Sequence, residues 1–341
     1  MLSYRANIRL RQYTTLFVGG VADYVVEATT EAEVEQAVRL AESAGQPLLV
    51  LGGGSNVLLD DAGWRGMVIV MKQTGVTYEE QGDTVLVTAE AGVVLDALIA
   101  EVTERGYWGL ENLSAIPGSV GATPVQNVGA YGVEVADCIT YVTALHKKSF
   151  IKKIFSRDDC LFSYRDSFFK TDEGREWIIL SVTFRLQKNY TPTLTYGDLQ
   201  SLQSREQLTP RMVRDAVIAI RAQKFPNWKK VGTAGSFFKN PIITNEQYTQ
   251  LKQQYSELPG YLQADGMVKV SLGWILDKVC NLRGYTEGNV GLYEAQALVL
   301  VNNRTATAAE IDAFAKKISE IVFSKTNIHI EREVCFIKNK K

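Results

Sequence analysis

The fold is decided by the stretch AIPGSVGATPVQNVGAYG, residues 115–132. It contains four glycines, two prolines and two side-chain amides. A long irregular segment of this kind inside a compact domain is usually functional. Glycine-rich backbone can approach an anion closely, because no side chain stands between its N–H groups and the ligand. The segment therefore predicts a ligand-binding loop.

A second glycine-rich loop, GGGSN at residues 52–56, follows the apolar run Leu48 to Leu51, which predicts a buried strand. The dinucleotide fingerprint G-x-G-x-x-G fails here because Val57 occupies its sixth position, and no P-loop sequence occurs in the chain. The local pattern leaves two alternatives, a simple hairpin turn or an anion-binding loop. Taken together, the two glycine-rich loops are suited to grip a diphosphate between them.

Capping boxes of the form T-x-x-E predict two helix starts, one at Thr30 with Glu33 and one at Thr307 with Glu310. Further helices are expected at about 94–104 and 210–221, and strands at 85–92, within 141–186 and at 327–337. After residue 226 the pattern changes to short helical segments and loops, which indicates a separate domain.

At 341 residues the chain is long enough for two or three domains. Its formal net charge of -1 argues against a broad nucleic-acid-binding surface. No apolar run approaches the ~18 residues of a membrane helix. The N-terminal segment MLSYRANIRLRQYTTLF has no secretory apolar core. We therefore expect a cytoplasmic protein without nucleic-acid or membrane partners.

The cysteines lie far apart and form no C-x-x-C pair, so the sequence indicates neither a zinc site nor a disulfide framework. They are Cys138, Cys160, Cys280 and Cys335. The two histidines, His146 and His329, also lack a metal-binding or catalytic motif. Acid–base chemistry is therefore expected from other side chains, and no metal is predicted.

One hydroxyl stands against two phenylalanines in the stretch AGSFFKN, residues 234–240. Burying a hydroxyl without a partner costs on the order of 1–3 kcal/mol. Ser236 is therefore either a turn or N-cap serine that the backbone satisfies, or a residue placed for chemistry. The local pattern leaves both alternatives open.

Several blocks in this order resemble the UDP-N-acetylenolpyruvoylglucosamine reductase family. They are GGGSNVL, IPGSVGATPVQNVGAYG, YRDSFFK, TYGDL, GTAGSFFKNP, QADGMVKVSLGWILDK and EREV. The matches extend from about Thr14 to Ile337, and TYGDL resembles the form of the family with an additional tyrosine loop over the substrate.

The resemblance implies an α+β protein with an FAD-binding fold of the vanillyl-alcohol-oxidase / p-cresol-methylhydroxylase type and a third, α+β substrate domain. The expected domains are FAD-binding subdomain 1 at 1–72, FAD-binding subdomain 2 at 73–222, to which 326–341 returns, and a substrate-binding domain at 223–325. The protein is expected to be a monomer.

The resemblance also implies an FAD-dependent oxidoreductase of peptidoglycan precursor synthesis that binds FAD non-covalently and uses NADPH as co-substrate. NADPH would reduce the flavin and leave. The enolpyruvyl group of UDP-N-acetylglucosamine enolpyruvate would then accept hydride from flavin N5 at C3 and a proton at C2, giving UDP-N-acetylmuramate. Negative charge would develop on C2 and spread into the carboxylate as an aci-carboxylate.

Three catalytic residues carry over from the family motifs. Arg165 in YRDSFFK would stabilise the aci-carboxylate, and its alternative is a surface ion pair with Asp166. Glu333 in EREV would donate a hydrogen bond to the carboxylate when protonated, with Glu331 locally equally plausible. Ser236 would give the proton to C2.

Ligand-binding residues carry over in the same way. The expected FAD contacts are Gly52, Gly53, Gly54, Ser55, Asn56, Ile116, Pro117, Gly118, Ser119, Gly121, Gln126, Asn127, Gly129, Ala130 and Tyr131. The expected sugar-nucleotide contacts are Tyr196, Lys224, Asn240, Tyr261, Arg283 and Gln296. Lys224 and Arg283 suit phosphate groups, whereas the two tyrosines suit stacking or hydrogen bonding to the nucleotide.

Three segments depart from the family pattern: YTEGNVGLY at 285–293 has fewer glycines, Cys335 replaces a common basic residue, and KKSFIKKIF at 147–155 is unusually basic. Two rival functions remain, another flavin oxidase of the same fold and a catalytically silent flavin- or nucleotide-binding protein. Many such oxidases attach FAD covalently through His or Cys. The first rival is disfavoured because both histidines lie outside the glycine loops, and the second gives no reason to retain Arg165, Ser236 and Glu333 together.

Overall fold

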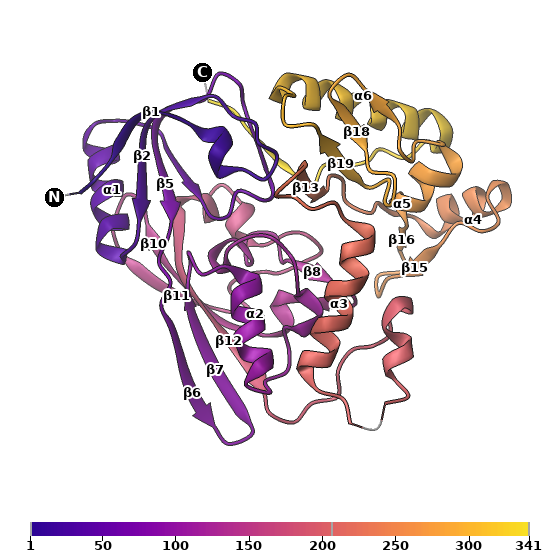
Figure 1. Cartoon of the computed structure of the whole chain (residues 1–341), viewed down its shortest axis with the longest axis horizontal. Coiled ribbons are helices and arrows are strands. Elements are labelled where there is room, and N and C mark those ends of the chain that lie inside the picture. The colour runs from indigo at the N-terminus through magenta and orange to yellow at the C-terminus, as the bar shows by residue number, and fades with distance from the viewer. Residues whose placement is uncertain (1, 206, 340–341) are drawn as a thin grey trace. The chain divides into compact units, whose positions relative to one another are not determined.

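A computed structural model describes residues 2–205 and 207–339 (Figure 1). The chain forms two compact units whose segments alternate along the sequence. Unit 1 comprises Met1–Ile8, Ala22–Gly54 and Trp64–Arg221, and unit 2 comprises Arg9–Val21, Ser55–Gly63 and Ala222–Lys341.

A four-stranded sheet of order β1-β2-β5-β3 stands at the start of unit 1. Its strands are β1 (Arg5–Arg9), β2 (Val21–Ala28), β3 (Leu48–Leu51) and β5 (Trp64–Met71). Strand β5 pairs in parallel with both β2 and β3. Parallel neighbours need a crossover connection, and α1 (Glu31–Ser43) supplies it with Val34, Ala37, Val38 and Ala41 on its buried face.

An antiparallel sheet of order β11-β10-β12-β7-β6 forms the larger part of unit 1 (Figure 1). Its strands are β6 (Val76–Gln81), β7 (Thr84–Glu90), β10 (Ile139–His146), β11 (Lys152–Ser156) and β12 (Trp177–Gln187). Helix α2 (Leu95–Glu104) packs its apolar side into the core that also contains Val85, Val87 and Val182. The strand and helix patterns expected at 85–92, 94–104 and 141–186 are thus confirmed.

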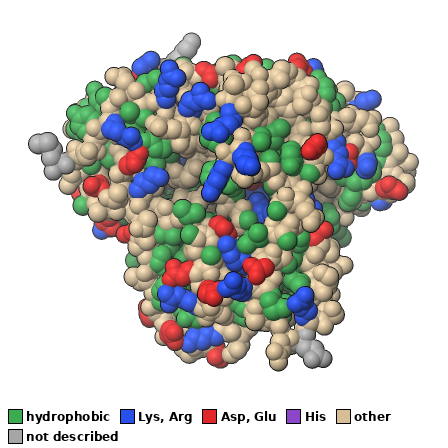
Figure 2. Space-filling view, in the orientation of Figure 1, with side chains coloured by type: hydrophobic (Ala, Val, Ile, Leu, Met, Phe, Trp, Pro, Cys, Tyr) green, Lys and Arg blue, Asp and Glu red, His purple; other side chains and the backbone are tan. Residues whose placement is uncertain are grey.

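Helix α3 (Pro210–Lys224) is tied to α2 within unit 1 by two arginines. Arg214 forms an ion pair with Asp96, and Arg211 forms one with Glu104. Figure 2 shows basic and acidic side chains interspersed over the face of unit 1 that carries these helices. The predicted helix at 210–221 is confirmed and continues to Lys224.

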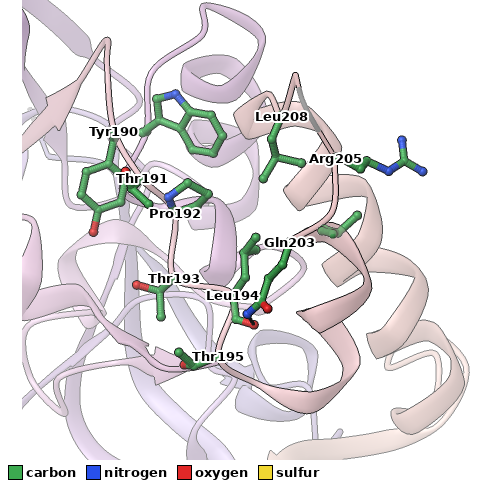
Figure 3. Close-up of a pocket in the computed structure, with 11 residues that line it drawn as sticks. Tyr190, Thr191, Pro192, Thr193, Leu194, Thr195, Gln203, Arg205 and Leu208 are labelled. Atoms are coloured by element: carbon green, nitrogen blue, oxygen red, sulfur yellow. Dashed lines mark hydrogen bonds between the residues drawn. The ribbon is translucent and has the colours of Figure 1, made fainter.

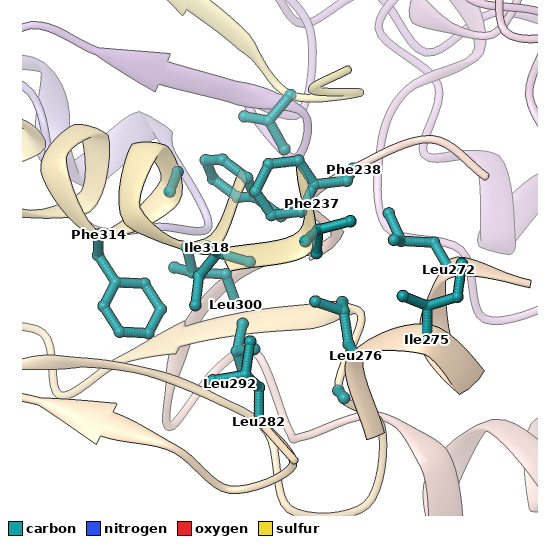
Figure 4. Packing of buried hydrophobic residues seen from close by; sticks show 14 of the residues in the cluster. Phe237, Phe238, Leu272, Ile275, Leu276, Leu282, Leu292, Leu300, Phe314 and Ile318 are labelled. Carbon is teal, nitrogen blue, oxygen red and sulfur yellow. The ribbon is translucent and has the colours of Figure 1, made fainter. Parts of the chain in front are cut away.

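Short strands and helices make up unit 2, in sheets of order β13-β19-β18-β17, β14-β16-β15 and β20-β4. The strands are β4 (Val57–Leu59), β13 (Gly232–Ser236), β14 (Ile242–Ile243), β15 (Gly260–Leu262), β16 (Val268–Val270), β17 (Thr286–Glu287), β18 (Val290–Leu292), β19 (Val299–Asn302) and β20 (Cys335–Ile337). The helices are α4 (Asn245–Gln254), α5 (Leu272–Trp274) and α6 (Ala308–Thr326). One apolar core joins them (Figure 4).

The remaining regular segments are short. They are the paired strands β8 (Gly129–Ala130) and β9 (Val133–Glu134), the 3-10 turns η1 (Leu10–Tyr13), η2 (Glu111–Leu113), η3 (Val120–Ala122), η4 (Val135–Asp137), η5 (Phe168–Lys170), η6 (Gly174–Glu176) and η7 (Gly197–Leu202), and the π-helical turn η8 (Ile275–Val279).

Both predicted capping boxes are present, with Thr30 and Thr307 each accepting from the amide of the glutamate three residues on. The strand expected at 327–337 is wrong in extent. Asn327 ends α6 in a left-handed conformation, and only Cys335–Ile337 pairs as a strand. Its partner is β4 at 57–59, whereas the sequence predicted a return to the segment 73–222. The expected boundary at 222–223 lies beside the boundary between the units, at Arg221–Ala222.

The GGGSN loop is not a hairpin turn, because the strands on its two sides do not pair with each other. Strand β3 pairs with β5, and β4 pairs with β20. The alternative of a simple hairpin is therefore excluded. Among the described residues, no helix combines the length and the apolar character needed to cross a membrane.

Phe237 is fully buried in the core of unit 2, directly after Ser236, and lies beside Phe238 in Figure 4. Replacing a buried phenylalanine by alanine removes apolar area and leaves a cavity, at a cost of about 3–5 kcal/mol. We predict that Phe237→Ala lowers the free energy of unfolding by about this amount, measured by urea denaturation with circular dichroism.

The matched control is Phe323→Ala on α6 of the same unit, where the ring is 39% exposed. We expect a loss below about 1 kcal/mol for this surface change. Equal losses for the two variants would contradict the burial assigned to Phe237.

Candidate active site

The two predicted glycine loops meet backbone to backbone within unit 1. A Cβ atom added to Gly52 would lie 2.2 Å from Ser119 Oγ, and one added to Gly53 would lie 2.9 Å from Gly118 Cα. Neither position therefore has room for a side chain. The glycines at 52 and 53 are required because residues 118–119 approach them so closely.

Ser119 lies at this junction with its hydroxyl buried. The residue is 3% exposed, and its Oγ has no hydrogen-bond partner among the described residues. A buried hydroxyl without a partner is unfavourable. The junction therefore presents a polar group that a bound ligand is suited to satisfy.

The start of the 115–132 loop is held by Asp96 of α2. Its Oδ1 accepts a hydrogen bond from the Ala115 amide at 2.6 Å, and Arg214 donates to both carboxylate oxygens at 2.5 and 3.1 Å. Burial alone would raise the pKa of Asp96, but the bonds from Arg214 and Ala115 outweigh it and hold the pKa below its usual range. The loop thus begins at a fixed, ionised anchor.

Arg221 of α3 places a second cation against the same loop. Its Nε donates to the Ala115 carbonyl at 3.3 Å, and its side chain is hydrogen-bonded to Tyr131 at the end of the loop. Burial lowers the pKa of the Arg221 guanidinium, whereas Tyr131 and Asp96 act in the opposite sense. A positive charge therefore stands beside both ends of the segment.

Asn127 stabilises the loop from inside, with 1% of its surface exposed. Its Nδ2 donates to Glu134 Oε2 at 2.6 Å and to the Ser163 carbonyl at 3.1 Å, while its Oδ1 accepts from the Ala136 amide at 3.1 Å. The Asn127 side chain thus bonds other residues of the protein and helps to fix the shape of the loop.

Arg165 points its guanidinium at the same loop. Its Nη2 donates to the Gly129 carbonyl at 2.7 Å and its Nη1 to the Asn127 carbonyl at 3.5 Å. The residue adopts a left-handed φ of 55°, which is uncommon for a side chain of this size. No ion pair links Arg165 to Asp166 among the described residues, so the alternative of a surface pair with Asp166 is excluded.

Ser236 follows an irregularity in strand β13. Between Thr233 and Ser236 the pairing with β19 shifts register, and Gly235 takes a φ of +72° there. Thr233 closes the bulge, with its Oγ1 donating to the Leu300 carbonyl at 2.8 Å and accepting from the Gly235 amide at 3.2 Å. A bulge next to a site redirects the following side chain.

The hydroxyl of Ser236 makes no hydrogen bond to any described residue, and the residue is half-buried. Phe237 and Phe238, 0% and 1% exposed, anchor the backbone just beyond it. Ser236 is therefore not the turn or N-cap serine of the first alternative. Its hydroxyl remains available to a ligand.

Glu333 of unit 2 bonds the backbone of Phe237, the residue after Ser236. The Glu333 amide donates to the Phe237 carbonyl at 2.9 Å, and Asn56 Nδ2 donates to the Glu333 carbonyl at 3.2 Å. Glu333 is half-buried, whereas Glu331 is exposed and forms an ion pair with Lys239 at 3.0 Å. These surroundings favour Glu333 over Glu331 as the functional carboxyl.

The residues of unit 2 that are expected to contact the sugar nucleotide differ in their exposure and in the bonds that their side chains make within the protein. Asn240 Oδ1 accepts from the Leu272 amide at 3.0 Å, and Gln296 Oε1 accepts from the Leu298 amide at 3.3 Å. Arg283 donates to the Glu294 carbonyl at 2.6 Å and pairs with Asp277. Tyr261 is 58% exposed on β15, and Lys224 is half-buried at the end of α3.

Tyr196 of unit 1 rests against the glycine loop. Its ring meets that of Tyr131 edge to face, with 5.1 Å between centroids. The segment around it borders a cavity of about 570 Å³, lined by residues that include Trp108, Pro192 and Leu208 (Figure 3). The segment that carries Tyr196 therefore borders a hollow.

The structure brings the predicted residues together in two groups. In unit 1, Gly52 and Gly53 meet the 115–132 loop, which Arg165 and Tyr196 also contact. In unit 2, Glu333 bonds the backbone of Phe237, which follows Ser236 in the chain. Sequence reasoning missed the residues that anchor the loop, which are Asp96, Asn112, Arg214 and Arg221. The one local feature in the sequence is that Asn112 stands three residues before Ala115, where the loop begins.

Comparison with known proteins identifies the class of protein first. Residues 22–152 match the family model of an FAD binding domain, and residues 226–337 match the C-terminal domain of UDP-N-acetylenolpyruvoylglucosamine reductase. The matches define an FAD-dependent oxidoreductase of the α+β type expected from the sequence.

Full-length relatives then define the family. The chain is 41% identical to the UDP-N-acetylenolpyruvoylglucosamine reductase of Pseudomonas aeruginosa, covering 97% of this chain and 98% of that one. It is 39% identical to the enzyme of that name from Escherichia coli O157:H7, covering 97% and 96%. The chain belongs to the UDP-N-acetylenolpyruvoylglucosamine reductase family, as its motifs indicated.

A solved structure supports the fold. The crystal structure of the Thermus caldophilus reductase (MurB) superposes with a TM-score of 0.69 at 23% identity, covering 98% of each chain.

The residues of unit 1 fit a bound flavin dinucleotide in three respects. The glycines at 52 and 53 leave the backbone bare where the loops meet. The Ser119 hydroxyl lacks a partner among the described residues, and Arg221 places a half-buried cation beside the loop. Backbone amides together with a cation suit a diphosphate.

We predict that Gly52→Ala weakens flavin binding roughly tenfold or more, because overpacking a close contact costs about 1–3 kcal/mol. The added Cβ would lie 2.2 Å from Ser119 Oγ but 3.4 Å from Ser119 Cβ. Removing that hydroxyl in the double variant Gly52→Ala/Ser119→Ala should therefore recover part of the loss relative to Ser119→Ala alone. Titrating flavin into the flavin-free protein measures the affinity of each variant. If the losses of the two single variants simply add in the double variant, the contact between residue 52 and the Ser119 hydroxyl is contradicted.

Proposed function

We propose that the protein reduces the enolpyruvyl group of UDP-N-acetylglucosamine enolpyruvate to the lactyl ether of UDP-N-acetylmuramate, using NADPH. The single observation that carries this proposal is the half-buried Ser236 hydroxyl, which has no hydrogen-bond partner among the described residues. Family membership supplies the substrate class, since the relatives are named for this reaction.

FAD, held non-covalently in this proposal, supplies the hydride when it is bound and reduced. The residues proposed to hold it are Gly52, Gly53, Gly54, Ser55, Asn56, Ile116, Pro117, Gly118, Ser119, Gly121, Gln126, Asn127, Gly129, Ala130 and Tyr131. Asn127 can take part only through its backbone, because its side-chain groups are bonded within the protein. No histidine or cysteine stands in either glycine loop, which supports non-covalent binding.

Arg165 is proposed to stabilise negative charge on the substrate carboxylate. Two carbonyls of the 115–132 loop hold its guanidinium, so the cation is fixed before the substrate binds. A donor fixed in advance needs no reorganisation when charge develops, and removing such a donor typically costs about 3–4 kcal/mol in the barrier. In its protonated form, Glu333 adds a hydrogen bond to the same carboxylate.

Ser236 is proposed to donate the proton to C2. A hydroxyl that is already bonded to the protein would have to break that bond first, whereas the Ser236 hydroxyl makes no such bond to a described residue. The bulge at Gly235 and the buried ring of Phe237 fix the backbone on either side. Positioned proton transfer of this kind contributes ~10²–10⁴-fold.

The sugar nucleotide is proposed to contact Tyr196, Lys224, Asn240, Tyr261, Arg283 and Gln296. Lys224 and Arg283 are suited to the diphosphate because a cation forms strong, charge-assisted bonds with phosphate. The exposed ring of Tyr261 is suited to stacking on the nucleotide. Binding through Arg283 would exchange its bond to Asp277 for one to the ligand.

We predict that Ser236→Ala still binds flavin and is still reduced by NADPH, because neither step needs the proton. Its reoxidation by the enolpyruvyl sugar nucleotide should slow by about 10²–10⁴-fold. Single-turnover absorbance of the flavin measures the two half-reactions separately.

The control is Ser324→Ala, a serine of the same unit whose hydroxyl bonds the Ile321 carbonyl of its own helix. It should reoxidise at the wild-type rate. Unchanged reoxidation in the Ser236 variant would remove this residue from the mechanism. A wild-type protein that is not reoxidised by the sugar nucleotide would overturn the proposed function.

A further inference from the structure

Asn112 is a fully buried side chain that joins two loops of unit 1. It lies in the turn η2, immediately before the 115–132 loop, and is 0% exposed. Its Nδ2 donates to the Tyr131 carbonyl at 2.9 Å and to the Thr193 carbonyl at 2.8 Å. One amide group thus bonds the end of the glycine loop and the segment that leads to Tyr196.

An asparagine occupies position 112 although the environment of its side-chain oxygen is unfavourable. Asn112 Oδ1 is buried and accepts no hydrogen bond from any described residue. A buried acceptor without a donor is costly. An apolar side chain would avoid this cost, so the two donated bonds are the feature that an asparagine provides at this position.

Two further contacts act at the same junction. The rings of Tyr131 and Tyr196 meet edge to face, with centroids 5.1 Å apart and planes at 81°. Gly132 has a φ of +83°, and a Cβ there would lie 3.2 Å from Thr193 Cγ2. The end of the glycine loop and the segment 193–203 that carries Tyr196, here called the tyrosine segment, therefore contact each other around Asn112.

A hollow lies beside part of the segment that carries Tyr196. Figure 3 shows Pro192, Leu194 and Leu208 around the cavity of about 570 Å³ that borders it. Leu199 and Leu202 pack against α3, but Tyr196 itself is 45% exposed. The Asn112 bonds thus fix one point of a segment that otherwise has a hollow beside it.

We propose that Asn112 is a positioning residue that sets the place of Tyr196 by tying the tyrosine segment to the glycine loop. It does not touch the reacting atoms and acts through Tyr196 on the binding of the sugar nucleotide. This inference rests on the proposed function, in which Tyr196 contacts that substrate.

The test is Asn112→Leu, which keeps the branched shape but removes both donors. With flavin at saturating concentration, KM for the sugar nucleotide should rise roughly tenfold. In the flavin-free protein, amide hydrogen exchange in the peptide spanning 193–203 should become faster, with peptides of β7 and β12 unchanged.

The matched control is Gln73→Met. Gln73 is 1% exposed, lies in the same unit and carries a buried oxygen without a partner, as Asn112 does. This variant should leave both KM and the exchange of 193–203 unchanged. Equal changes in the two variants would mean that Asn112 has only a general structural role and would overturn the proposal.

The double variant Asn112→Leu/Tyr196→Phe tests the route. If Asn112 acts through Tyr196, the double variant should have the KM of the worse single variant, whereas multiplied effects would overturn the proposal. If Tyr196→Phe raises KM but Asn112→Leu keeps the wild-type KM, only the coupling is rejected. If the wild-type enzyme is inactive with the sugar nucleotide, the proposed function is rejected. If Asn112→Leu does not fold, Gly132→Ala strains the same junction, and an unchanged KM and exchange would reject the coupling.

Discussion

The close approach of two backbones, at Gly52–Gly53 and Gly118–Ser119, is the constraint on which unit 1 depends. It brings together two loops that are more than sixty residues apart in the sequence. The rest of the 115–132 loop is supported both at its start and along its length. Asp96 and Arg221 bond Ala115, whereas Arg165 bonds the Gly129 carbonyl.

Those supports are electrostatic and half-buried. Asp96 and Arg214 fix the start of the loop, and Arg221 reaches from Ala115 to Tyr131. Removing one partner of such a network would leave an uncompensated charge away from water, which is strongly unfavourable. The same burial that makes the network costly also keeps its positive charge effective toward an anionic ligand.

Sequence reasoning succeeded where the signal is local and stopped where the partner is distant. The capping boxes at Thr30 and Thr307 involve residues three apart, and both helices begin as predicted. The residues at 327–337 look strand-like throughout, yet only Cys335–Ile337 finds a partner, and that partner is β4. A charge pair such as Asp96 with Arg214, 118 residues apart, leaves no trace in one sequence. Family motifs pointed to Ser236 and Glu333, but only the coordinates show the backbone bond between Glu333 and Phe237, the residue after Ser236.

Three polar groups without a partner among the described residues lie at places where function is proposed. Ser119 Oγ lies where the glycine loops meet, Asn112 Oδ1 lies where the tyrosine segment is attached, and the Ser236 hydroxyl lies at the end of β13. A protein selected for stability alone would replace such groups or satisfy them, since each buried one is unfavourable. Ligands can satisfy Ser119 and Ser236 directly. Asn112 differs, because its unfavourable oxygen accompanies two bonds that the protein uses to hold a loop in place.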